Sequence, residues 1–144
     1  MTDFHASTLV RLGGGRSSRQ YTDLRGTPTS LEELDSHDLV VFGDYMLRPF
    51  EAINWILEVG RGANGPRRPT LCVNSVYGMY RAVKSRLGIA ALPHYISDES
   101  PELQEILPGL EHPSIEAYFV YPEELRSSKR VLVIRDFLLQ QAST

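Results

Sequence analysis

The fold is decided by residues 71–95, which read LCVNSVYGMYRAVKSRLGIAALPHY. An apolar strand is followed by a polar turn at Asn74 and Ser75, and then by apolar residues at helical spacing: Val76, Tyr80, Val83 and Leu87. The run from Gly88 to Leu92 is uniformly apolar, as in a strand covered on both faces, and Pro93 ends it. This order predicts a βαβ unit. Its turn lies at a helix N-terminus, where free amides and the helix dipole favour a carboxylate or phosphate by roughly 0.3–1 kcal/mol. Simple helix capping would use the same two residues, so both interpretations stay open.

Composition narrows the class of protein. The 144 residues are 42% hydrophobic and 23% charged, which is typical of a globular protein. The net charge of −3 gives no basic field for a phosphate backbone, so we expect no DNA binding by this chain alone.

No apolar run is long enough to span a membrane, and residues 1–15 lack the pattern of an export signal. The single cysteine, Cys72, excludes an intrachain disulfide, and its apolar surroundings predict a buried, inert thiol in a reducing cytoplasm.

Outside the central unit the predicted elements are shorter. Residues 1–19 have weak periodicity and a glycine-rich tract resembling a linker, so we expect poor order there and regular structure from about Gly26. Ser30 and Glu33 have capping-box spacing and predict a short helix over 31–34, followed by a strand over 38–43. Asn64 and Gly65 predict a hairpin between strands at 53–59 and 69–73. A helix over 101–106, a strand over 115–121 and a helix from Ser127 or Ser128 to about residue 141 complete the chain.

Motifs for catalysis, metals or cofactors are not found. The four histidines show no metal-ligand spacing and are expected at surfaces or caps: His5, His37, His94 and His112. There is no phosphate-binding loop, dinucleotide fingerprint or nucleophile elbow. The adjacent pairs Glu32-Glu33 and Glu123-Glu124 complement helix starts. Two small basic clusters are interpreted as solvated faces, with contact to an anion or a partner as the alternative: Arg67-Arg68, and Arg126 with Lys129 and Arg130. We therefore expect no metal, no cofactor and no enzyme activity.

The order of several short motifs resembles the effector-binding domain of LysR-type transcriptional regulators over about residues 20–141. The motifs, in the family's order, are Gly26-Thr-Pro, Leu39-Val-Val-Phe-Gly, Asn54-Trp55, Val73-Asn-Ser, Ala82-Val-Lys-Ser-Arg-Leu-Gly-Ile-Ala-Ala-Leu-Pro-His-Tyr, Ile106-Leu-Pro and Val120-Tyr-Pro-Glu-Glu-Leu-Arg-Ser-Ser-Lys-Arg-Val. None is specific alone. Seven in order make coincidence improbable.

The resemblance implies an α/β fold of the periplasmic-binding-protein-like (type 2) kind, in which an effector binds between two Rossmann-like lobes. This chain resembles the second lobe plus the strand and helix that return to the first; the winged helix-turn-helix and most of the first lobe have no counterpart. The implied organisation is an N-terminal segment 1–19, an effector-binding lobe 20–114, and a returning strand and helix 115–144. With its sheet neighbours missing, the returning strand would leave an edge and an apolar helix face uncovered, which predicts a dimer or larger assembly.

Carried over residue by residue, the resemblance places seven residues in the wall of the effector cleft: Phe42, Gly43, Asp44, Asn74, Ser75, Val76 and Pro93. For Phe42 and Pro93, core packing or chain termination would explain the residue equally well, and Trp55 is assigned to the core. Relatives often have glycine where this chain has Arg86, so either Arg86 bears the strain of the helix end or Gly88 makes the turn.

Three functions are compatible with these observations. The favoured one is a non-enzymatic sensor of a small, anionic metabolite within a LysR-type regulator in the cytoplasm. The alternatives are a fragment of a solute-binding protein, which would need an export signal and both lobes, and a small α/β enzyme, which would need a clustered nucleophile or acid–base pair.

Overall fold

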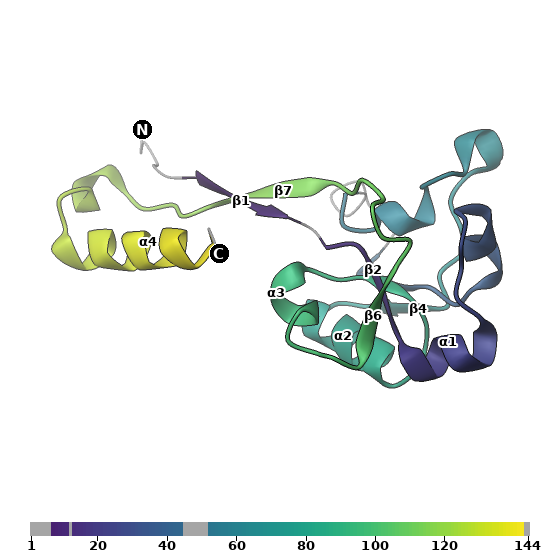
Figure 1. Cartoon of the computed structure of the whole chain (residues 1–144). Helices are drawn as coiled ribbons and strands as arrows, with labels where there is room; N and C mark the ends of the chain where they lie inside the picture. The colour runs from purple at the N-terminus through teal and green to yellow at the C-terminus, as the bar shows by residue number, and fades with distance from the viewer. Residues whose placement is uncertain (1–6, 12, 45–51, 143–144) are drawn as a thin grey trace. The chain divides into compact units, whose positions relative to one another are not determined.

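The computed structural model describes residues 7–11, 13–44 and 52–142. The chain divides into two compact units, which are described separately (Figure 1). One unit, here called the lobe, is Leu12–Pro113, and the other, the terminal unit, combines Met1–Arg11 with Ser114–Thr144. No helix in the described part of the chain is long and apolar enough to cross a membrane.

The lobe is built on a mixed sheet whose strands are β2 (Gly15–Ser18), β3 (Val40–Phe42), β4 (Leu71–Val73), β5 (Ala90–Ala91) and β6 (Leu103–Ile106). β3 pairs in parallel with β4, and a parallel bridge from Leu39 to Ile89 joins β3 to β5. β2 lies between β5 and β6 and runs antiparallel to both. The hydrogen-bonded order is therefore β4-β3-β5-β2-β6, in which only β2 opposes the others.

Alternating residues of the central strands enter two separate cores, so the sheet is covered on both faces. Val40, Ala90 and Leu92 pack on one face with residues of α2 (Val76–Lys84), which lies along the sheet in Figure 1. Their chain neighbours pack on the other face: Leu39, Val41, Ile89 and Ala91. That second core is closed by α1 (Arg19–Arg25) and by the 3-10 turns Glu32–Ser36 and Trp55–Leu57. The prediction that the apolar run from Gly88 to Leu92 is covered on both faces is confirmed.

The N-terminal segment is not the linker that its glycines suggested. β2 and the strand β1 (Ser7–Arg11) both fall before Gly26, and α1 begins at Arg19. Gly13 is buried, and a Cβ atom there would lie 1.6 Å from the carbonyl oxygen of Leu92. The glycine serves close approach of two backbones rather than flexibility.

Two predicted elements are wrong. Trp55, Ile56 and Leu57 form a 3-10 turn and all three are buried, which a strand with one exposed face cannot achieve; β4 pairs in parallel with β3, so no hairpin forms. The predicted helix over 101–106 is instead strand β6, because pairing with β2 outweighs the local helix-start signal. The helix in this region is the short α3 (His94–Ser97).

Two side chains differ from expectation in burial. Cys72 is exposed, because β4 pairs only with β3 among the described strands and turns this side chain to solvent. Arg67, read from sequence as part of a solvated face, is only 5% exposed and binds buried backbone carbonyls.

The C-terminus of α2 shows which of two residues, Arg86 or Gly88, makes the turn that ends the helix. Arg86 has φ +67°, and the N–H of Leu87 donates to the carbonyl of Ala82, five residues back, so Arg86 takes the left-handed position. The helix ends at Lys84, and its buried residues, Met79, Ala82 and Val83, form a face rotated from the predicted one.

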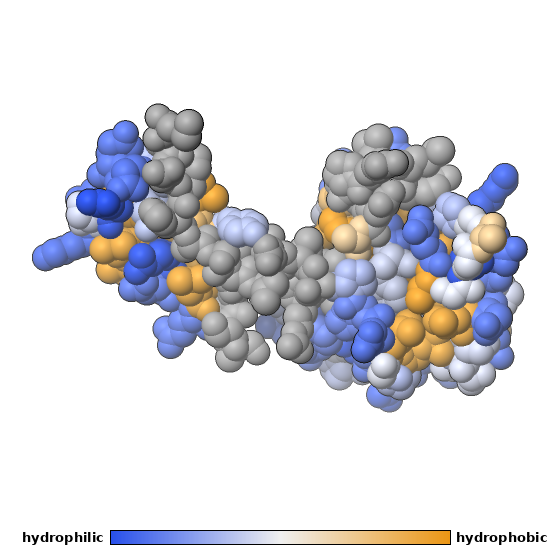
Figure 2. Space-filling model, turned by 90° about the horizontal axis from the view of Figure 1, so that it is seen from above, coloured by the Kyte–Doolittle hydropathy of each residue, from blue (hydrophilic) through white to orange (hydrophobic). Residues whose placement is uncertain are grey.

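In the terminal unit, β7 (Ser114–Tyr118) has a partner that the resemblance did not foresee. It pairs antiparallel with β1, from Ser7 opposite Tyr118 to Arg11 opposite Ser114. The helix α4 (Lys129–Ala142) follows and is confirmed. Its apolar residues remain exposed: Val133 67%, Ile134 52%, Phe137 57% and Leu138 43%. Apolar residues are visible at the surface of this unit on the left of Figure 2.

Candidate functional site

The sequence-predicted cleft residues follow three neighbouring strands that run in the same direction. Phe42 ends β3 and residues 43–44 follow it, residues 74–76 follow β4, and Pro93 follows β5. Because β4, β3 and β5 are parallel, these ends meet at one edge of the sheet. The N–H of Gly43 donates to the carbonyl of Val73 at 2.8 Å, which joins the first two ends directly. Such an edge is where open α/β sheets receive ligands. It is called the strand-end edge below.

β3 and β5 separate at this edge. The N–H of Val40 donates to the carbonyl of Ile89, but two residues later Phe42 pairs with a side chain instead. Asn54, 3% exposed, accepts from the N–H of Phe42 at 2.9 Å and donates to its carbonyl at 2.8 Å. Asn54 thus replaces a strand neighbour and satisfies the backbone where the two strands part. From the sequence, Asn54 was identified only as part of a motif shared with the family, and this structural role was not predicted.

The N-terminus of α2 lies on the same edge. Ser75 has extended φ and ψ, and its hydroxyl accepts from the N–H of Gly78 at 3.2 Å, so it caps the helix. Asn74 and Ser75 are both exposed, and Val76 is half-buried. The turn therefore faces solvent, and amides of the first helical turn carry the positive end of the dipole toward it. Capping by Ser75 does not exclude ligand contact, which stays a prediction.

A cluster of polar side chains lies beside these residues and was missed from sequence. Arg16 on β2 donates through Nη2 to Nδ1 of His94 at 3.3 Å and to Asp98 at 3.4 Å. Since arginine can only donate, Nδ1 of His94 is the acceptor in this contact, and it also lies 3.6 Å from Oδ1 of Asp98. The rings of His94 and His112 are 5.8 Å apart, and His112 stacks on Trp55 at 6.2 Å. No sequence pattern links these residues; only strand register and the turn after β5 bring them together.

The seven predicted residues differ in exposure. Asp44, Asn74 and Ser75 are exposed, Phe42, Gly43 and Val76 are half-buried, and Pro93 is buried. Pro93 precedes α3, and its carbonyl accepts from Ser97, so chain termination and helix entry explain it structurally.

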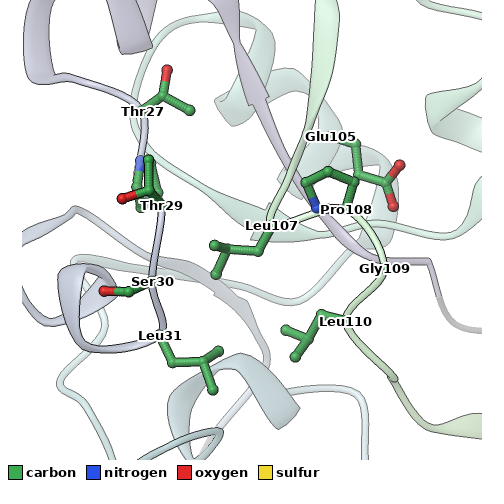
Figure 3. Close-up of a pocket in the computed structure, with 10 residues that line it drawn as sticks. Thr27, Thr29, Ser30, Leu31, Glu105, Leu107, Pro108, Gly109 and Leu110 are labelled. Carbon is green, nitrogen blue, oxygen red and sulfur yellow. The ribbon is translucent and has the colours of Figure 1, made fainter.

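An open cavity of about 560 Å³ lies elsewhere on the lobe, between residues 27–31 and 105–110 (Figure 3). Leu31, Leu107 and Leu110 point toward one another across it, while the carboxylate of Glu105 points away. The side chains of Thr29 and Ser30 are already bound to Glu33. No predicted cleft residue lines this cavity. Because this cavity has an apolar floor and the predicted cleft residues lie elsewhere, we take the strand-end edge as the candidate site.

Among the described residues no group of histidine, cysteine or acidic side chains could hold a metal ion.

Comparison with known proteins gives the family. Residues 17–143 match the family described as the LysR substrate binding domain. A Haemophilus influenzae protein named "Uncharacterized HTH-type transcriptional regulator" is 30% identical over 113 residues, which are 74% of this chain but 37% of that protein. The chain thus spans well under half the length of this relative.

Solved structures agree in fold. The CrgA regulatory domain of Neisseria meningitidis, a LysR-type regulator, superimposes with a TM-score of 0.70 at 23% identity, covering 97% of this chain and 68% of that one. The full-length Vibrio cholerae virulence activator AphB gives 0.68 at 17% identity, covering 98% and 48%. At such identities the likeness shows the fold, which is the expected α/β, periplasmic-binding-protein-like one.

Proposed function

Because the chain belongs to the family of LysR substrate-binding domains, we propose that its lobe senses a small, anionic metabolite at the strand-end edge and thereby controls transcription. Domains of this family are non-enzymatic parts of transcription regulators that bind effectors and oligomerise. Neither a solute-binding protein nor an α/β enzyme is supported by this family match.

The observation that carries the proposal is the open convergence of three parallel strand ends with the N-terminus of α2. Asn74 and Ser75 are exposed there, with helix amides behind them, so a small anion could be bound without moving the sheet. The strands themselves are fixed by two buried cores, which makes the edge a rigid platform for recognition.

A charge substitution tests this site. Native mass spectrometry of the purified chain identifies any copurifying molecule, and calorimetry then measures its affinity for the variants Asn74→Asp and Asn64→Asp. Both asparagines are exposed, but Asn64 lies in the 3-10 turn Gly62–Asn64, outside the predicted site. We expect Asn74→Asp to weaken binding of an anion about fivefold, from roughly 1 kcal/mol of repulsion, and Asn64→Asp to leave it unchanged. Equal effects of the two variants would contradict the assignment.

We also propose that the exposed face of α4 mediates self-association. Val133, Ile134 and Phe137 are each more than half exposed, which is unfavourable for apolar side chains left in water. Sedimentation should show a mass that rises with concentration, and Phe137→Gln should shift it toward the monomer. Leu24→Gln is the matched control, since Leu24 is 78% exposed on α1. A monomer at all concentrations would refute this part.

Two further expectations concern the setting of the domain. We propose that it works in the cytoplasm and does not bind DNA by itself, in keeping with a net charge of −3. A gel shift by this chain alone at physiological salt would contradict the second expectation.

A further inference from the structure

The open cavity between residues 27–31 and 105–110 has an apolar floor. Its volume of about 560 Å³ lies within the roughly 300–1,000 Å³ that is typical of small-molecule sites. Leu31, Leu107 and Leu110 converge on it (Figure 3). All three are half-buried and pack against the core that contains Trp55, so their remaining exposed sides form the floor. A ligand that covers these leucines would complete the burial that the core begins.

The lining of the cavity offers no charge to a ligand. Glu105 is the only charged residue among those that line it, and its carboxylate points away from the centre (Figure 3). The hydroxyl groups of Thr29 and Ser30 are both hydrogen-bonded to Glu33. A charged ligand would lose hydration in this cavity without gaining an ionic partner, whereas a neutral, apolar ligand has no such cost.

Both walls of the cavity are fixed by contacts outside it. On one side, Pro28 is fully buried and the carbonyl of Leu31 accepts from Arg67 at 2.8 Å. On the other side, β6 pairs with β2, and the N–H of Leu110 donates to the carbonyl of Leu107 at 3.3 Å. A ligand therefore meets walls that are already ordered, and this preorganisation favours affinity.

Leu107 is held in a backbone conformation that leucine rarely adopts. Its φ is +53°, in the left-handed region that glycine, asparagine and aspartate tolerate but that is unfavourable for other residues. Its side chain points into the cavity (Figure 3). Strained residues of this kind concentrate at ligand sites, where the surrounding structure keeps a side chain in the position that binding needs. The conformation of Leu107 thus points to the same cavity independently of its volume.

We propose that this cavity is a binding site for a small, neutral, apolar molecule and that it is separate from the strand-end edge. The site goes beyond the proposed function, since none of the seven predicted cleft residues lines it. A monocyclic aromatic or short aliphatic alcohol belongs to the right class, because its hydrocarbon part covers the three leucines while its hydroxyl stays at the open mouth, in water. A hollow between two short loops suits such a molecule better than a protein partner, since stable protein interfaces bury about 800 Å² on each side.

Methyl NMR of the leucine-labelled chain tests the site, once the signals of Leu31, Leu107 and Leu110 are assigned by substitution. The chain is titrated with benzyl alcohol, cyclohexanol and indole, and with benzoate as the charged counterpart of benzyl alcohol. We expect at least one neutral probe to shift the methyl signals of all three leucines saturably, and benzoate to leave them in place. If no neutral probe shifts them, or if benzoate shifts them as strongly as benzyl alcohol does, the inference is overturned.

The variant Leu107→Asn separates recognition from folding, because asparagine tolerates the left-handed backbone but presents an amide to the cavity. The responsive probe should bind about tenfold more weakly to this variant. Leu24→Asn is the control and should leave the affinity unchanged, since Leu24 is 78% exposed on α1 and does not line the cavity. Equal affinities of wild type and folded Leu107→Asn would also overturn the inference. If Leu107→Asn does not fold, the titrations of the wild-type chain decide.

Two further outcomes distinguish this site from other uses of the chain. If the leucine methyl signals shift with the concentration of the chain itself and not with any probe, a side chain of a second copy fills the cavity and the inference fails. If benzoate shifts the backbone amides of Asn74 and Ser75 while a neutral probe shifts the leucine methyl signals, the chain has two separate sites and both proposals hold.

Discussion

Replacing Arg67 with methionine probes the internal clamp of the lobe. Arg67 is 5% exposed and donates to three backbone carbonyls, those of Leu31 at 2.8 Å, Ile56 at 3.1 Å and Val59 at 2.6 Å. Its Nε also binds Asp35 at 2.6 Å. One side chain therefore ties the loop before the 3-10 turn Glu32–Ser36 to the 3-10 turn Trp55–Leu57.

The expected loss of stability follows from these contacts. Methionine has a similar length but no donor, so the carbonyls of Ile56 and Val59 lose this partner, whereas the carbonyl of Leu31 still accepts from the N–H of Leu34. A buried carbonyl left unpaired costs about 1–3 kcal/mol, and partial access of water to the Val59 carbonyl reduces the sum for the two. Asp35 adds little, because its carboxylate is 44% exposed and keeps Arg61 as a partner. We expect the free energy of unfolding to fall by about 3–5 kcal/mol.

Urea unfolding followed by Trp55 fluorescence measures this loss within the lobe. Arg68→Met is the matched control, since Arg68 is the exposed neighbour of Arg67. Arg67→Lys should fall between the two, because one ammonium group cannot reach all three carbonyls in the directions of the guanidinium. If Arg67→Met is as stable as Arg68→Met within about 0.5 kcal/mol, the hydrogen bonds of Arg67 do not stabilise the lobe as described.

Three further predictions concern other positions of the lobe. Gly13→Ala should lower the free energy of unfolding by about 1–3 kcal/mol in urea titrations, since its Cβ would lie 1.6 Å from the carbonyl oxygen of Leu92. Gly14→Ala is the control and should lower it less, because a Cβ there meets only side-chain atoms, which can move. Arg86→Gly should raise the melting temperature, because it relieves a left-handed residue at φ +67° and gains up to about 1 kcal/mol. Burial, and then the charge of a nearby arginine, lowers the pKa of His37, so the unfolded state takes up the proton first as the pH falls. Uncharged His37 therefore favours the folded state above the unfolded-state pKa of about 6.5, and this stabilisation is lost as the pH falls toward the lower pKa of the folded state. Across this pH range the urea midpoint of His37→Gln should change less than that of wild type.

The central strands and α2 could be predicted because their pattern is local. The run from Gly88 to Leu92 is apolar at every position, and a doubly covered strand is one of few structures that accept this. β6 could not be predicted, since Leu103 to Ile106 has no strand pattern of its own and becomes a strand by pairing with β2. The glycines before β2 were misread because a flexible linker and a close backbone approach both favour glycine.

The candidate site was predictable only in part. The resemblance named residues at strand ends, and parallel register brings these to one edge. Arg16, His94 and His112 are far apart in sequence, and their proximity depends on β2 lying between β5 and β6.

An NMR map of the backbone amides that respond to a bound small acid tests the central claim most directly. The account predicts that the signals of Gly43, Asn74, Ser75 and Val76 shift together, with saturation at one common affinity. Shifts confined to Leu31, Leu107 and Leu110 around the apolar cavity, with the strand-end edge unchanged, would contradict it.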